Sequence, residues 1–153
     1  MALEKVLTSK TRSPAPTAPS EADHTLNISV VFTSVESTIM ALRKAGALAT
    51  SLNAQITLLV TQIVPYPLPL ESPPVLLDWN ERRFHTIAAE SPAETTVRIY
   101  LCRDGVETLK NSLPPKSLVV IGGRQVWWPF TREKRLAMQL RHAGHEVIYT
   151  KTE

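Results

Sequence analysis

Short apolar runs alternate with helix-like stretches along most of this chain, and this alternation constrains the fold more than any other feature. The runs are rich in β-branched residues and predict strands at residues 28–33, 55–61, 95–102, 118–121 and 145–150. The stretches between them predict helices at about 34–52, 75–90, 105–113 and 131–143. Strands joined by helices pair in parallel through right-handed crossovers. We therefore predict an α/β domain with one doubly wound, five-stranded parallel sheet and helices on both faces.

Two parts of the chain are predicted to lie at the margin of this domain. Residues 1–26 contain the segment Ser13–Ser20, with three prolines, and have no large apolar residue between Leu7 and Leu26. Such a segment cannot bury enough surface to offset its ordering entropy, so we predict a disordered N-terminal tail at 1–26 and one domain at 27–153. The run 95–102 alternates polar and apolar residues, which predicts an edge strand.

Composition restricts the class of protein. The chain has 153 residues, of which 43% are hydrophobic, so it can form one domain with a core. No apolar stretch reaches the roughly 20 residues that span a bilayer, and the single cysteine, Cys102, cannot form an intrachain disulfide. We therefore expect no membrane insertion and a cytoplasmic location. The formal charge of +3 is small, which makes nucleic acid the least favoured partner.

The fourth predicted strand runs into two glycines, and its end is a candidate ligand site. Ligands of open α/β sheets bind at the carboxyl ends of strands, where the strand order reverses. The predicted ligand-binding residues come from the two strand ends that meet there and from the next helix: Thr33, Ser34, Gly122, Gly123, Arg124 and Thr131. The alternative is that the glycines only provide a tight exit from the sheet.

The residues after the two glycines predict a second candidate surface. Its members are aromatic residues of one short segment and basic residues of the last predicted helix: Trp127, Trp128, Phe130, Lys134, Arg135 and Arg141. These side chains form a candidate partner-binding surface. Alternatively, the rings fold over the ligand cleft and fill it as core, and the helix is an ordinary amphipathic surface helix.

Residues for catalysis or metal binding are not recognisable in the sequence. His142 and His145 are separated by the helix-ending Gly144, so they are not expected to form a metal pair. Cys102 lies at a strand end, where a buried structural thiol is the favoured interpretation. No spacing indicates a nucleophile with its base, so we expect no enzymatic activity and no metal.

Three motifs resemble the universal stress protein family. They are Ser34-x-x-Ser37-x-x-x-Ala41-Leu42 after the first strand, Ala45-x-x-Leu48-Ala49 in its helix, and the run Arg103–Leu109 before the third helix. The resemblance covers residues 27–150 and implies a strand order of 3-2-1-4-5. It also implies a homodimer through the last strand, with Val147 and Tyr149 at the contact.

The resemblance also implies where ATP would bind, and this sequence departs from that pattern. ATP-binding members carry Gly-x-x-Gly, nine residues and Gly-Ser or Gly-Thr after the fourth strand. Here Gln125 or Val126 stands at the second glycine and Arg135-Leu136 at the later pair, while Thr33 replaces an aspartate at the end of the first strand. A Cβ at these positions would occupy the space of the phosphates.

We therefore predict a universal-stress-protein-like regulatory or binding module, with a stress-response or accessory role, that needs no cofactor and does not bind ATP in the usual way. The alternative is a divergent nucleotide-binding protein that holds ATP, AMP or another adenine nucleotide at Gly122-Gly123-Arg124. A second alternative is nucleic-acid binding through Trp127, Trp128 and the basic last helix.

Overall fold

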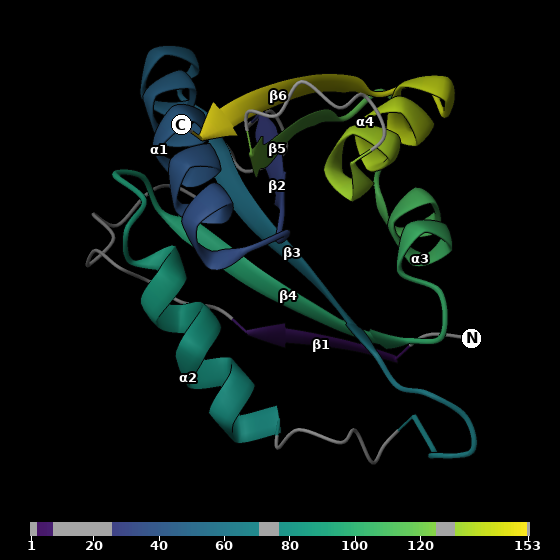
Figure 1. Cartoon of the computed structure of the whole chain (residues 1–153). Helices are drawn as coiled ribbons and strands as arrows, with labels where there is room; N and C mark the ends of the chain where they lie inside the picture. The colour runs from purple at the N-terminus through teal and green to yellow at the C-terminus, as the bar shows by residue number, and fades with distance from the viewer. Residues whose placement is uncertain (1–2, 8–25, 71–76, 125–130, 153) are drawn as a thin grey trace.

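The computed structural model describes residues 3–7, 26–70, 77–124 and 131–152. Within these residues, six strands form one sheet in the order β1-β4-β3-β2-β5-β6 (Figure 1). The strands are β1 (Leu3–Leu7), β2 (Asn27–Val31), β3 (Gln55–Ile63), β4 (Thr95–Cys102), β5 (Leu118–Arg124) and β6 (Glu146–Thr152). The helices are α1 (Val35–Leu52), α2 (Leu77–Ala88), α3 (Gly105–Ser112) and α4 (Arg132–His142).

The five strands from β2 to β6 confirm the predicted sheet. They pair in parallel in the order β4-β3-β2-β5-β6, which is the predicted order 3-2-1-4-5. The strand order reverses at β2, which pairs with β3 on one side and with β5 on the other. The carboxyl ends of β2 and its neighbours therefore meet at one edge of the sheet, which is where the ligand site was predicted.

Helices cover both faces of the sheet (Figure 1). On one face, Leu42 of α1 and Phe84 of α2 belong to a buried cluster with Val30 of β2. On the other face, Leu109 of α3 and Leu140 of α4 belong to a second cluster, which includes Val31 of β2. Because both faces of the central strands are buried, their sequences are continuous apolar runs, and this pattern made them predictable.

The helices begin at polar residues that satisfy free backbone N–H groups. Ser34, Asp104 and Thr131 are the N-caps of α1, α3 and α4, and each accepts a hydrogen bond from the N–H group three residues later. At its other end α1 stops at Asn53, whose φ of 52° is left-handed. Helix α1 packs closely because Gly46 leaves room for the ring of Pro92, which a Cβ would meet at 2.3 Å.

The N-terminal part of the sheet differs from the prediction. Residues 3–7, predicted as part of a disordered tail, form β1, which pairs antiparallel with β4 from Leu3 opposite Leu101 to Leu7 opposite Val97. Strand β4 therefore lies inside the sheet, and its predicted edge position is wrong. A free edge of β4 would present unpaired backbone groups, and a five-residue strand is enough to pair with them. Residues 8–25 of the predicted tail lie outside the described residues.

Two searches of the described residues give negative findings. No helix there is long and apolar enough to cross a membrane. In the same part of the chain, histidine, cysteine, aspartate and glutamate side chains nowhere gather in a group of three that could hold a metal ion.

Candidate functional site

Strand β5 passes through the two glycines that were predicted to open a pocket. It continues to Arg124, and its last three residues, Gly122 to Arg124, pair with Thr150, Lys151 and Thr152 of β6. The prediction that the strand breaks at the glycines is therefore wrong. The backbone of Gly122 and Gly123 belongs to the sheet and does not form a loop around a ligand.

Packing explains why these two residues are glycines. A Cβ on Gly122 would lie 2.0 Å from the backbone oxygen of Ser37, in the first turn of α1. A Cβ on Gly123 would lie 1.9 Å from the hydroxyl oxygen of Tyr149. Atoms cannot approach so closely, so the glycines allow α1 and the Tyr149 ring to pack against β5.

The polar side chains predicted around the glycines also have partners in the fold. Thr33 donates from Oγ1 to the carbonyl oxygen of Gly122 at 2.8 Å, which joins the ends of β2 and β5. Ser34 accepts from the N–H of Ser37 at 3.3 Å, and Thr131 accepts from the N–H of Lys134 at 3.2 Å. Arg124 is exposed at the end of β5. The structure thus does not assemble an anion cradle from the predicted set.

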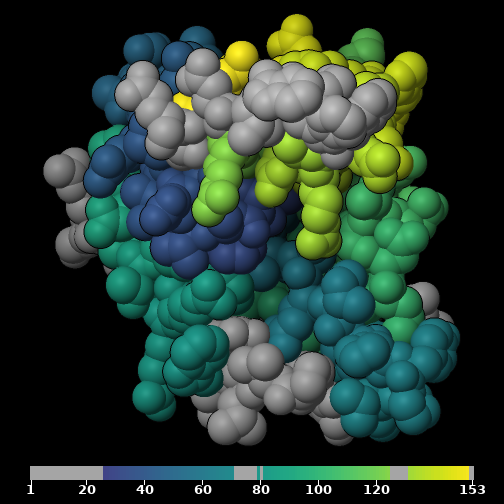
Figure 2. Space-filling model, in the orientation of Figure 1, coloured from purple at the N-terminus to yellow at the C-terminus, as the bar shows by residue number. Residues whose placement is uncertain are grey.

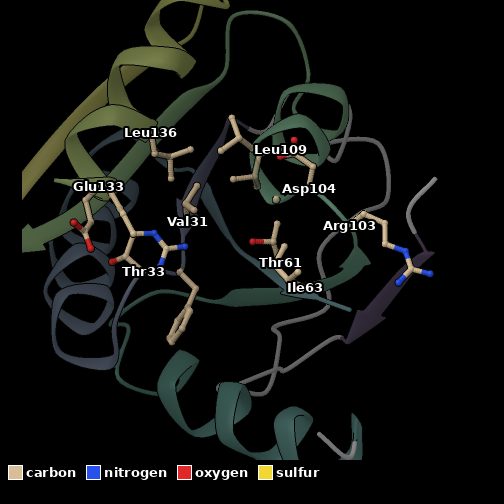
Figure 3. Close-up of a pocket in the computed structure, with 13 residues that line it drawn as sticks. Val31, Thr33, Thr61, Ile63, Arg103, Asp104, Leu109, Glu133 and Leu136 are labelled. Carbon is tan, nitrogen blue, oxygen red and sulfur yellow. The ribbon is translucent and has the colours of Figure 1, made fainter. Parts of the chain in front are cut away.

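A pocket of about 520 Å³ opens beside these residues, at the carboxyl ends of β2 and β3. Figure 3 shows Leu136 of α4 and Leu109 of α3 near each other on one side of it, with Val31 and Thr61 of the sheet below them. Figure 2 shows the hollow in the surface, bordered by α4 in yellow-green, α3 in green and β3 in dark teal. Of the predicted ligand-binding residues, Thr33 lines this pocket among the described residues.

The wall of the pocket is apolar at its centre and charged at its rim. The charged residues of its described lining are Arg103, Asp104, Arg132 and Glu133, so positive and negative charges balance. Asp104 accepts from the N–H of Glu107 at 3.2 Å as the cap of α3. The mixture of apolar surface with a few polar groups is typical of a small-molecule site.

Arg103 holds the rim of the pocket in place. Its side chain points away from the cavity (Figure 3). The guanidinium donates to the carbonyl oxygen of Val64 at 2.6 Å and lies 4.0 Å from the centroid of the Tyr66 ring. Arg103 therefore fixes the segment after β3 against the start of α3, and its charge is directed outside the pocket.

The chemically reactive side chains outside the pocket have structural environments. Burial raises the pKa of the Cys102 thiol, which is 1% exposed and lies 3.9 Å from the carbonyl oxygen of Gln62. Burial also raises the pKa of Tyr149. His145 is buried and accepts a hydrogen bond from the N–H of Ser117 at 3.1 Å. The described lining of the pocket contains neither cysteine nor histidine, so this arrangement is suited to binding.

The predicted partner-binding surface is described only in part. Trp127, Trp128 and Phe130 lie outside the described residues. Arg135 and Arg141 are exposed on α4, and Lys134 is half-buried there. Arg141 donates to the carbonyl oxygen of Val147 at 3.1 Å. Strand β6, which carries the predicted dimer residues Val147 and Tyr149, is the outermost strand of the described sheet on its side.

The prediction missed most of the pocket. Thr61 and Ile63 come from the end of the second parallel strand, and Arg132 and Leu136 from the first turns of α4. The rule that ligands bind at strand ends was applied to the first and fourth parallel strands and not to the second. The end of that strand, Thr61–Ile63, was therefore an available signal.

Comparisons with known proteins identify the fold. A scan against protein-family models and a search of curated proteins both find no match. A solved universal stress protein from Archaeoglobus fulgidus is 17% identical, with a TM-score of 0.57, over 82% of this chain and 93% of its own. A universal stress protein in complex with cAMP is 14% identical, with a TM-score of 0.55, over 84% of this chain and 98% of its own. The universal stress protein from Archaeoglobus fulgidus in complex with dAMP is 14% identical, with a TM-score of 0.53, over 84% of this chain and 98% of its own. The chain therefore has the universal stress protein fold, as its motifs predicted.

Proposed function

We propose that this chain is a binding module that holds a small ligand of mononucleotide size in the pocket at the ends of β2 and β3. The observation that carries the proposal is the pocket itself, which lies where the strand order reverses. Its volume of about 520 Å³ is within the range of small-molecule sites. Its wall offers apolar side chains for a flat ring and charged groups for orientation.

Two structural neighbours support adenine mononucleotides as the ligand class. The solved structures with the same fold hold cAMP in one case and dAMP in another. Both ligands carry one phosphate group. In this chain Leu109 of α3 and Leu136 of α4 belong to one apolar cluster and line the pocket, where they offer an apolar wall for a base.

The same geometry disfavours ATP bound through a glycine loop. Gly122 and Gly123 are paired within β5, and the carbonyl oxygen of Gly122 accepts from Thr33. The residues that follow, 125–130, read Gln-Val-Trp-Trp-Pro-Phe and contain no glycine. The sequence after β5 therefore lacks the glycine-rich loop in which backbone N–H groups bind a triphosphate.

Pocket-filling variants test this proposal by isothermal titration with AMP. We expect micromolar binding of AMP to the natural chain. Binding to Leu136→Trp should be at least about tenfold weaker, because the indole fills the pocket. Val106→Trp fills the pocket from α3 and provides a second variant if Leu136→Trp does not fold. Met138→Trp is the matched control, since Met138 is exposed on the same helix as Leu136.

The result that contradicts the proposal is equally direct. Absence of saturable AMP binding to the natural chain would exclude this ligand class. Equal affinities for the natural chain and a folded pocket-filling variant would place the bound nucleotide elsewhere on the molecule.

A further inference from the structure

An arginine on α2 lies among three aromatic rings next to the pocket. The guanidinium carbon of Arg83 is 5.8 Å from the ring centroid of Phe32, 5.8 Å from that of Trp79 and 5.7 Å from that of Phe84. The Phe32 and Phe84 rings pack edge to face, with centroids 4.9 Å apart. These contacts hold the cation against a small aromatic cluster at the surface.

Phe32 connects this cluster to the pocket. It is the residue after β2, it lines the pocket, and its ring is one of the three around Arg83. Figure 3 shows helix α2, in faint teal, passing along the side of the pocket that lies opposite α4. Arg83 is not one of the described lining residues, and its link to the pocket is its contact with the ring of Phe32.

Within the described residues, the Arg83 guanidinium makes no hydrogen bond. Its side chain is exposed, and within the described part of the chain its contacts are the three rings, with no ion pair and no hydrogen bond. A guanidinium has five N–H donors, whose planar arrangement matches the oxygens of a phosphate or carboxylate. Because the Arg103 guanidinium is directed outside, Arg132 is the positive charge of the described lining beside Asp104 and Glu133, and Arg83 adds a second one near Phe32.

We propose that Arg83 binds the anionic group of the ligand held in the pocket. This inference rests on the proposed function and adds the orientation of the ligand. The flat ring lies against Leu109 and Leu136, and the phosphate reaches past Phe32 to α2. Arg83 thereby binds the anionic group in place of Gly122, Gly123 and Arg124, which were predicted as ligand-binding residues.

Arginine side-chain NMR and calorimetry with three probes test the assignment. The probes are AMP, adenosine and inorganic phosphate, and the variants are Arg83→Gln, Arg82→Gln and Arg132→Gln. Arg82 is the matched control because it is the exposed neighbouring arginine on the same helix. Arg132 carries the competing positive charge in the pocket lining.

We expect Arg83→Gln to weaken AMP binding about tenfold, which is the scale of one charge-assisted hydrogen bond. The affinity for adenosine should be unchanged. Arg82→Gln should leave both affinities unchanged. The Nε–H signal of Arg83 should shift on titration with AMP and, more weakly, with phosphate. The assignment would be overturned if Arg83→Gln still prefers AMP over adenosine as the natural chain does. It would also be overturned if this preference is lost only in Arg132→Gln.

The outcomes separate this inference from the proposed function. If AMP binds in the pocket and Arg83→Gln has no effect, the pocket holds the nucleotide and the assignment of Arg83 is wrong. If AMP does not bind but phosphate shifts the Arg83 signal with saturation, the anion site is supported and the nucleotide is excluded. If neither probe binds, both are wrong.

Discussion

At the scale of single residues, the two glycines of β5 show how the same residue type serves packing or ligand binding. Gly122 faces a backbone atom of α1, and Gly123 faces the Tyr149 ring. Neither contact leaves space for a side chain. A backbone atom yields less easily than the end of a flexible side chain, so Gly122 is the more demanding position.

Substitution at Gly122 tests this packing role. Gly122→Ala places a Cβ against the carbonyl oxygen of Ser37, and we expect it to lower the free energy of unfolding by about 2–3 kcal/mol. Gly105→Ala is the control: there the nearest atom is Thr61 Oγ1 at 3.0 Å, and we expect a change within about 1 kcal/mol. Urea unfolding measures both changes. Equal stability of Gly122→Ala and the natural chain would show that packing does not require this glycine.

At the scale of elements, β1 is an addition to a sheet that is complete without it. Among the helices and strands, β4 is the main contact of β1. The alignments with solved structures of the same fold include 93–98% of those proteins and 82–84% of this chain. The uncovered share is close in size to residues 1–26. We therefore expect that the fold does not depend on the N-terminal strand.

Removal of residues 1–7 should leave the rest of the domain folded. The backbone hydrogen bonds of β1 are offset in large part by the entropy of ordering five residues, so we expect a loss of only about 1–3 kcal/mol in the free energy of unfolding. The edge of β4 would then be exposed, and association should rise with protein concentration. Urea unfolding and light scattering measure these effects, with the full-length chain as control. A truncated chain without a cooperative transition would show that β1 is part of the core fold.

The elements also show what the sequence could predict. Strands β2, β3 and β5 are buried on both faces, so continuous apolar runs revealed them, and the helices between them determined the parallel order. Strand β1 was missed because its five residues adjoin a long polar segment and pair only with a distant strand. The pocket was missed for a related reason, since Thr61, Asp104 and Leu136 come together only in the folded chain.

At the scale of the whole molecule, the doubly wound sheet brings four separate regions to one site. The ends of β2 and β3, the start of α3 and the start of α4 enclose the pocket, and α2 adds Arg83 at its border. Residues 125–130 supply no glycine after β5. We therefore propose that the pocket holds a mononucleotide, with no glycine-rich loop in the sequence after β5 for the second and third phosphates of ATP.

The most direct test compares the affinities of the natural chain for AMP and ATP by isothermal titration under the same salt conditions. We predict that AMP binds with micromolar affinity and that ATP binds no more than about threefold tighter, because no glycine-rich loop follows β5 to bind the additional phosphates. Binding of ATP that is about tenfold or more tighter than that of AMP, or absence of AMP binding, would contradict it.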